Sequence, residues 1–152
     1  MASRLSRLDE IYDGYSIFFI TACTHQRHAL LNNAALHTAF RTFCENARAH
    51  NILVGRYVLM PDHAHFFVTL PDADMLPMWM KSFKNSLSKV MREAGHAAPH
   101  WQKTFFDHVV RSEASYEDKW IYVQQNPVRA GLVAEARDWP YQGELNRVLF
   151  GK

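Results

Sequence analysis

Two histidines separated by a single alanine, His63 and His65, stand in the segment "YVLMPDHAHFFVTLPD" of residues 57–72. Side chains alternate along a β-strand, so both imidazoles point to one face and Ala64 points to the other. At this spacing the two Cα atoms lie about 6–7 Å apart, and two neutral imidazoles can bind one divalent cation. The same pattern fits two half-exposed histidines at a strand end. A metal site therefore requires a third ligand and a reacting group.

A second segment, "WIYVQQNPVRAGLV" of residues 120–133, offers both. Tyr122 and Asn126 are four residues apart, which places them on one face of a helix. The amide oxygen of Asn126 suits a hard cation, and the phenol of Tyr122 could attack a phosphorus atom. Alternatively, Tyr122 packs in the core and Asn126 only ends the helix before Pro127.

The chain resembles a known family in three segments that follow one another, "MPDHAHFF", "WQKTFFDHVVRSEASYEDKW" and "YVQQNPVRAGLV". Together they resemble the REP-associated tyrosine transposases, which belong to the single-tyrosine HUH superfamily of insertion-sequence transposases. The resemblance covers residues 15–133. It implies a ferredoxin-like fold, dependence on Mg²⁺ or Mn²⁺, and nicking and rejoining of single-stranded DNA near hairpins formed by repetitive extragenic palindromes.

The resemblance also implies a role for individual residues. His63, His65 and Asn126 would bind the metal ion, and Tyr122 would be the nucleophile that forms a 5′-phosphotyrosine intermediate. Related transposases often carry glutamine at the position of Asn126, but Gln125 would lie on a different face of the helix.

A base for Tyr122 is not identified by the sequence. The ordinary pKa of tyrosine is about 10, so the phenol must lose its proton during attack. His108 in "FFDHVVR" is a candidate, although at strand spacing it fits a structural residue equally well, and Asp107 would point to the opposite face.

The expected elements alternate between aromatic or β-branched runs and helical periodicity. The strands are expected at residues 14–24, 52–60, 63–70 and 103–112, and the helices at 32–51, 75–95 and 115–126. The expected helix caps are Asn32 or Asn33, Asp74, and Ser115. The order β-α-β-β-α-β-α predicts an α+β, ferredoxin-like antiparallel sheet with helices on one face, plus a C-terminal helix that carries the tyrosine. We expect a single domain over residues 1–152, with a core at about 14–133 and a tail at 134–152.

Composition sets broad limits on the function. A net charge of +2 and a pI of about 8.6 allow a nucleic-acid partner without requiring one. Cys23 and Cys44 form no disulfide framework or CxxC pair, and the chain contains no apolar run of signal-peptide or membrane-spanning length. We expect a cytoplasmic protein that does not bind membranes.

Several basic residues are candidates for DNA contacts. The helix of residues 75–95 carries a polar stripe of Lys81, Lys84, Asn85 and Ser88, with Lys89 and Arg92 nearby. Such a stripe fits phosphate contacts and also an ordinary solvated helix face. Arg111 and Arg129 could bind phosphates bidentately, and Arg4 and Arg7 could enter a groove or read a guide sequence beside the hairpin.

Trp101, Trp120 and Trp139 could stack on unpaired bases, although tryptophans in a domain of this size are more often core residues, and we expect this of Trp120. Two other functions fit parts of the pattern. One is a protein that binds hairpin DNA without cutting it. The other is a metal-independent phosphoesterase with paired HxT or HxS motifs, which would need a second motif that the sequence lacks. The chain could act as a monomer or as a homodimer in which one copy's tyrosine serves the partner's histidines.

Overall fold

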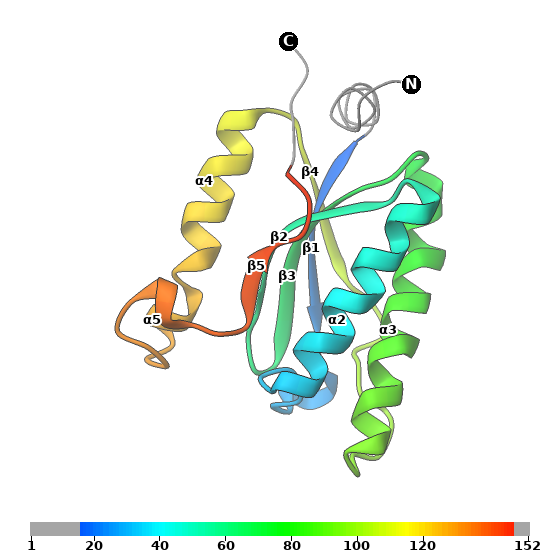
Figure 1. Cartoon of the computed structure of the whole chain (residues 1–152), viewed down its shortest axis with the longest axis vertical. Helices are drawn as coiled ribbons and strands as arrows, with labels where there is room; N and C mark the ends of the chain where they lie inside the picture. Colours follow the sequence, from blue (N-terminus) through cyan, green and yellow to red (C-terminus); the bar gives the residue numbers. More distant parts are fainter. Residues whose placement is uncertain (1–15, 148–152) are drawn as a thin grey trace.

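The computed structural model describes residues 16–147 of the chain (Figure 1). Its strands are β1 (Ile17–Cys23), β2 (Leu53–Leu59), β3 (His63–Thr69), β4 (Phe106–Val110) and β5 (Gln142–Glu144). Its helices are α2 (Ala34–Asn46), α3 (Leu76–Glu93), α4 (Glu113–Gln124) and α5 (Asn126–Arg129). Short 3₁₀ turns are formed by His25–Arg27, Ala47–His50, Ala73–Met75 and Ala136–Asp138. The predicted order β-α-β-β-α-β-α is confirmed as far as α4.

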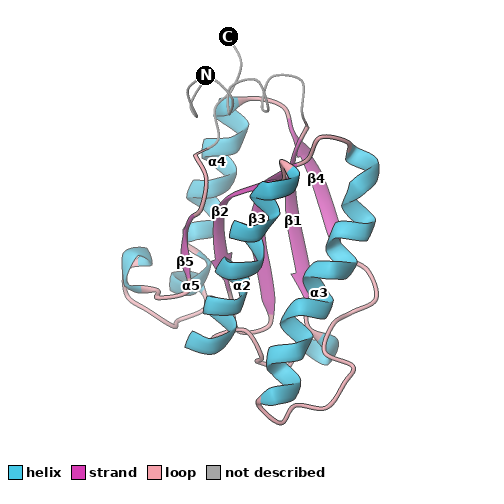
Figure 2. Ribbon diagram, turned by 45° about the vertical axis from the view of Figure 1, so that its right-hand side comes forward, coloured by secondary structure: helices cyan, strands magenta, loops and turns pink. Residues whose placement is uncertain are grey.

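The five strands form one antiparallel sheet in the order β4-β1-β3-β2-β5. Helices α2 and α3 pack side by side on one face of this sheet, and α4 lies on the other (Figures 1 and 2). The first four strands have the arrangement that a ferredoxin-like β-α-β-β-α-β unit gives, so the predicted fold is confirmed.

The face covered by α2 and α3 carries the larger apolar core. Alternate residues of β3 point into it, namely Ala64, Phe66 and Val68. Phe83 of α3 is fully buried, and its ring centroid lies 5.1 Å from that of Phe66 and 5.8 Å from that of Phe40. Most of the aromatic burial that stabilises the fold is therefore on this face.

The face covered by α4 carries a smaller core. Phe67 of β3 and Tyr116 of α4 pack with ring centroids 4.2 Å apart, and Val123 is the second buried residue of α4. Burial raises the pKa of Tyr116 to about 12, against an opposing effect of Arg56. Because α4 buries only these two side chains, it covers this face incompletely.

Of the three predicted helix caps, one is confirmed and two are wrong. Asn33 caps α2 as expected, because its side chain accepts a hydrogen bond from the backbone N–H of Leu36. Helix α4 is capped by Ser112 and not by Ser115. The extended backbone of Ser112 lets its hydroxyl accept a hydrogen bond from the N–H of Ser115, three residues along.

Helix α3 begins after a 3₁₀ turn in which the side chain of Asp72 accepts from the N–H of Asp74, so Asp74 is not the cap. Pro77 stands in the first turn of α3, where it has no N–H to leave unpaired.

The segment expected to be a tail contributes the edge strand β5, which pairs with β2. Gly143 permits this pairing, because a Cβ there would lie only 3.0 Å from the hydroxyl of Tyr57. Upstream of β5, the indole N–H of the buried Trp139 donates to the carbonyl of Leu59. Across residues 16–147, no helix has the length and hydropathy needed to span a bilayer.

Candidate active site

The two histidines of the pair begin β3 and point to the face that α4 covers. Their ring centroids lie 4.7 Å apart, at an interplanar angle of 77°. Ala64 between them is fully buried on the opposite face, under α2 and α3. The predicted alternation across β3 is therefore confirmed.

Both imidazoles use the same ring nitrogen for contacts within the protein. Nδ1 of His63 lies 2.8 Å from Oδ1 of Asp62, and Nδ1 of His65 lies 2.9 Å from the hydroxyl of Thr21. The carboxylate of Asp62 only accepts, so we assign the His63 proton to Nδ1. Within the described residues Nε2 of each ring then remains available as a metal ligand, held in place by a partner on the other nitrogen.

Both histidines are neutral at physiological pH. Burial, followed by the interaction with His63 and the positive charges of Lys119, Arg27 and Arg129, lowers the pKa of His65 to about 3. Burial also lowers the pKa of His63, although the carboxylate of Asp62 opposes this shift. A neutral imidazole is the form that binds a metal ion.

Arg27 holds the loop after β1 against this pair. Its backbone is left-handed, with φ of 57°, and its Nε donates to Oδ2 of Asp62 at 2.9 Å. The same guanidinium lies 3.2 Å from Cys23 Sγ and 3.2 Å from Nδ1 of His63. Burial alone would raise the pKa of Asp62, but the hydrogen bonds from Arg27 and His63 outweigh it, so the pKa is lowered. Asp62 therefore remains ionised and orients His63.

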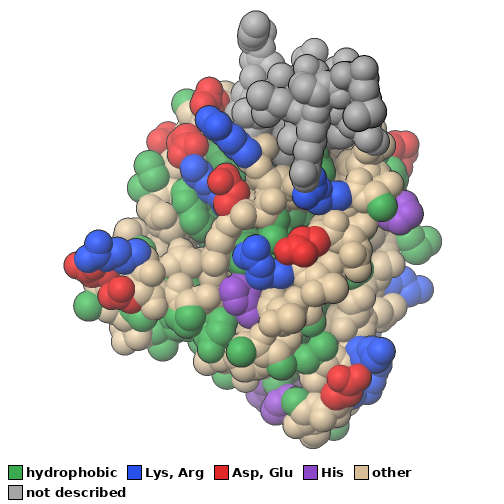
Figure 3. Space-filling model, in the orientation of Figure 1, with side chains coloured by type: hydrophobic (Ala, Val, Ile, Leu, Met, Phe, Trp, Pro, Cys, Tyr) green, Lys and Arg blue, Asp and Glu red, His purple; other side chains and the backbone are tan. Residues whose placement is uncertain are grey.

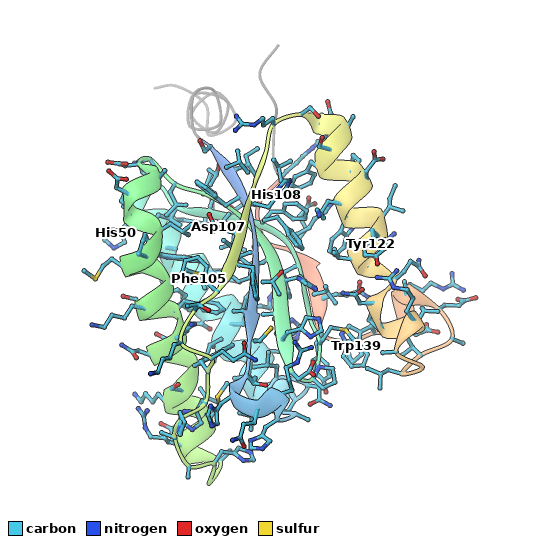
Figure 4. All side chains as sticks on the ribbon, turned by 180° about the vertical axis from the view of Figure 1, so that it is seen from behind. His50, Phe105, Asp107, His108, Tyr122 and Trp139 are labelled. Carbon is cyan, nitrogen blue, oxygen red and sulfur yellow. The ribbon has the colours of Figure 1, made fainter. Side chains whose placement is uncertain are left out.

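Tyr122 lies near the end of α4 and is not a core residue, since its side chain is 64% exposed. The guanidinium carbon of Arg129 lies 4.0 Å from the centroid of its ring. Arg129 is also close enough to His65 to lower its pKa. The same cation thus contacts the tyrosine ring and acts electrostatically on His65, and Figure 4 shows Tyr122 on α4 just before the turn into α5.

Asn126 begins α5. The prediction that Asn126 continues the helix of Tyr122 is therefore wrong. Helix α4 ends at Gln124 because Pro127 has no N–H to donate to Val123, and the N–H of Gln125 turns to the carbonyl of Tyr122 instead. The amide oxygen of Asn126 accepts a hydrogen bond from Arg129.

The donor set partly fits a divalent cation. Two neutral imidazoles with anchored Nδ1 atoms supply nitrogen ligands, and the amide of Asn126 would have to leave Arg129 to supply an oxygen. Within residues 16–147, no group of three or more His, Cys, Asp or Glu side chains is placed to hold a metal. An amide or a substrate oxygen would therefore have to complete the coordination.

Besides the carboxylate of Asp62, three positively charged side chains from different elements act on the pair. Arg27 follows β1, Arg129 ends α5, and Lys119 of α4 places its ammonium 5.1 Å from the ring centroid of Phe19. Phe19 in turn stacks on His65 with ring centroids 5.2 Å apart. Three cations beside a strand end can attract and orient a phosphate group.

A family model described as "Transposase IS200 like" matches residues 15–125, which is most of the chain. The protein belongs to the IS200-like transposase family.

Two curated relatives carry the name REP-associated tyrosine transposase. The one from Escherichia coli K12 is 29% identical over 91 residues, which covers 58% of this chain and 52% of that protein. One from Haemophilus influenzae, whose name is marked as provisional, is 27% identical over 120 residues, covering 68% of this chain and 64% of that protein. The IS200-like chain therefore spans about half to two thirds of the length of these relatives.

A solved structure of a REP-associated tyrosine transposase bound to a REP hairpin is similar to this chain. The two superpose with a TM-score of 0.64 at 26% sequence identity, covering 84% of this chain and 75% of the other. The sequence-based resemblance to the REP-associated tyrosine transposases is thus confirmed by family, sequence and fold.

The basic residues expected to contact DNA lie in two separate parts of this IS200-like transposase. Lys81, Lys84, Lys89 and Arg92 are on α3, which covers the face opposite the histidine pair. On this side of the molecule, Lys and Arg side chains lie beside Asp and Glu and do not gather in one basic patch (Figure 3).

Lys84 has a contact within the protein. Its ammonium donates to the carbonyls of Gln102 and Thr104, and burial lowers its pKa. These hydrogen bonds hold the loop before β4 against α3. Arg111 is exposed directly after β4, and Arg4 and Arg7 lie outside the described residues.

The three tryptophans considered for base stacking are covered. Trp101 and Trp139 are buried, at 8% and 7% exposure. Trp120 is half-buried, packs against the core under α4 as expected, and lies 5.7 Å from the guanidinium of Arg56.

His108 is not packed in the core, as a structural residue would be. It is exposed and points to the α4 side of β4, whereas Asp107 points to the α3 side, as predicted (Figure 4).

Four residues beside the pair were not predicted from the sequence: Thr21, Arg27, Asp62 and Lys119. Two of them carried a usable signal. Asp62 directly precedes His63, and Lys119 stands three residues before Tyr122 and so shares its helical face. Thr21 and Arg27 come together with the pair only through the β1–β3 register, in which Thr21 is opposite His65.

Proposed function

We propose that this member of the IS200-like transposase family is a DNA-nicking and strand-transferring enzyme. It acts on single-stranded DNA near REP-type hairpins through a 5′-phosphotyrosine intermediate. The observation that supports this most directly is the position of Arg129. It lies over the exposed ring of Tyr122 and also acts on His65, so that a phenol and two neutral imidazoles share one basic surface.

The proposed cofactor is Mg²⁺ or Mn²⁺, held by Nε2 of His63, Nε2 of His65 and the amide oxygen of Asn126. When bound, such an ion polarises a phosphate oxygen and stabilises negative charge on the leaving group. The lowered pKa values of both histidines support this assignment, because no proton has to be displaced from either ring.

In the proposed step, the phenol oxygen of Tyr122 attacks the scissile phosphorus in line with the leaving oxygen. The new bond joins the tyrosine oxygen to the 5′ phosphate, and the bond from phosphorus to the 3′ oxygen breaks. The phenol proton leaves, and the released 3′ oxygen takes up a proton to give a free hydroxyl. Attack of a 3′-hydroxyl on the phosphotyrosine reverses these changes and rejoins strands without ATP.

Arg27, Lys119 and Arg129 would hold the phosphate and orient it toward Tyr122. Bidentate contacts from the two guanidinium groups would fix the in-line geometry, and Lys119 would add charge from α4. Their placement on three elements around His65 supports this role.

Hairpin DNA is the proposed partner. A relative of similar fold was solved bound to a REP hairpin, which supports the same ligand class here. A hairpin-binding protein that does not cut is the competing proposal, and Tyr122 would then be dispensable.

The decisive experiment is adduct formation on a hairpin oligonucleotide with single-stranded flanks and Mn²⁺. Wild-type protein is expected to form a covalent complex with a 5′ DNA end, visible as a shifted band in a denaturing gel. Tyr122→Phe should form none, whereas the matched control Tyr141→Phe should behave as wild type. An adduct with Tyr122→Phe would refute the nucleophile, and gel shifts without cleavage in Mg²⁺, Mn²⁺ and other divalent ions would favour the non-cutting protein.

A further inference from the structure

Phe106, at the start of the edge strand β4, is 64% exposed. It pairs with Thr21 of β1, and Thr21 pairs with His65 of β3. Residues directly opposite one another on neighbouring strands point to the same face of a sheet. Phe106, Thr21 and His65 therefore form one row on the face that α4 covers.

The register of the rest of β4 agrees with this orientation. Val110 belongs to the core under α4, so the alternate residues His108 and Phe106 point the same way. Phe105 packs instead against the core under α2 and α3. Figure 4 shows His108 on the α4 side of β4 and Phe105 on the α3 side.

The exposure of Phe106 has no explanation in packing. Helix α4 follows β4 and leaves the start of this strand uncovered, since Phe106 and His108, which point to the α4 side, are both exposed. An aromatic ring that is exposed beside the candidate site has a free face on which a planar ligand group can stack. The tryptophans cannot take this role, because they are buried or half-buried.

We propose that Phe106, with His108 beside it, forms a stacking subsite for one or two unpaired bases of the DNA strand. This inference rests on the proposed function in taking single-stranded DNA as the ligand. A base stacks on a phenylalanine ring whatever its sequence, and an imidazole serves as a second platform. Aromatic residues on the open face of an antiparallel sheet bind successive bases in the same way in other nucleic-acid-binding folds.

The distance between Phe106 and the histidine pair fits a short stretch of single-stranded DNA. Phe106 and His65 are separated by two strand spacings, or about 10 Å. A phosphate at the pair and a base on Phe106 can therefore belong to nucleotides that are close in sequence. The subsite would fix which phosphate reaches Tyr122.

Charge on this face is complementary to the proposed occupant. Arg27, Lys119 and Arg129 lie around His65 and attract the backbone of the strand. The acidic Asp107 points away, to the α3 side (Figure 4). In the row Phe106, Thr21 and His65, the exposed Phe106 ring is thus at one end and the positively charged side chains are at the other.

The test measures binding of a hairpin that carries single-stranded flanks, with 2-aminopurine at each flanking position in turn. Wild-type protein is expected to quench one or two of these positions and to bind the flanked hairpin more tightly than a blunt one. Phe106→Ala and Phe106→Leu should abolish the quenching and weaken binding by about 5- to 150-fold. Phe106→Trp should retain both.

Met78→Ala is the matched control, because Met78 is 70% exposed on α3, on the opposite layer. Thermal melts establish that each variant is folded. Wild-type affinity that does not depend on the flanks, or a Phe106→Leu variant that binds and quenches like wild type, overturns the subsite even if Tyr122 forms its adduct. Quenching that depends on Phe106 without any adduct supports the subsite and refutes the proposed reaction.

Discussion

On the α2/α3 face of the sheet the rings of Phe40, Phe66 and Phe83 are fully buried, whereas on the α4 face His65 is half-buried and Phe106 is 64% exposed. The difference follows from the helices. Two long helices cover the first face, and one helix that buries only Tyr116 and Val123 covers the second.

This comparison shows how one small domain can combine stability with an open site. A polar or charged group in the α2/α3 core would be costly to desolvate, so that face accepts apolar side chains almost exclusively. The partly covered face tolerates imidazoles, a free phenol and three cations, because solvent or a ligand can reach them. The following predictions compare the two faces.

The largest effect is expected from Phe83→Ala in the α2/α3 core. Removing a fully buried ring leaves a cavity among aromatic neighbours and should lower the free energy of unfolding by about 3–5 kcal/mol. Urea denaturation measures this loss. On the α4 face, Phe106→Ala should change stability by less than about 0.5 kcal/mol. Equal losses for the two variants would show that the faces do not differ in this way.

The second prediction concerns Asp62 on the α4 face. Asp62→Ala removes the acceptor that orients His63, and should weaken Mn²⁺ binding and raise the Mn²⁺ concentration for half-maximal adduct formation by about 10- to 100-fold, or about 1.4–2.8 kcal/mol. Calorimetric titration with Mn²⁺ in the absence of DNA separates metal binding from catalysis.

Asp118→Ala is the control for this prediction, because Asp118 is an exposed acid on α4. Unchanged Mn²⁺ affinity in Asp62→Ala would contradict the role of Asp62 in holding His63.

The smallest effect is a pH dependence on the α2/α3 side. The Nε2 atom of His37 lies 2.7 Å from the hydroxyl of the buried Tyr57, and burial, together with the charge of Arg41, lowers the pKa of His37. Above the unfolded-state pKa of about 6.5, both states are neutral at this residue and its contribution to stability is complete. As the pH falls, the unfolded chain binds a proton that folded His37 resists, so stability falls by at most about 1.4 kcal/mol per pH unit.

His37→Gln keeps a hydrogen-bonding side chain but does not titrate. Its free energy of unfolding, measured in urea from pH 8 to pH 5, should therefore fall less steeply than that of wild type. Because His63 and His65 also have lowered pKa values, a residual slope should remain in the variant. Identical slopes in the two proteins would contradict the assignment to His37.

The order of elements was predictable because hydrophobic periodicity depends on residues that are close in sequence. The strand alternation at His63, Ala64 and His65 predicted which side chains share a face, and β3 has that alternation. Pro127 was correctly expected to end the helix of Tyr122, but the helix was predicted to run to Asn126 and it ends at Gln124. The cap at Ser112 was missed for a local reason, since Ser115 offers the same side chain three residues later.

By itself, the sequence determined the candidate ligands, the candidate nucleophile, the family resemblance and the strand and helix order, since each depends on residue type and short spacing. Only the tertiary structure decided which residues surround the pair. The register of β1 with β3 and β4 brings Thr21, Arg27 and Phe106 to His65 from distant parts of the chain. The register of strand pairing and the exposure of a sheet end depend on contacts across the whole fold. A pattern of neighbouring residues therefore does not predict them.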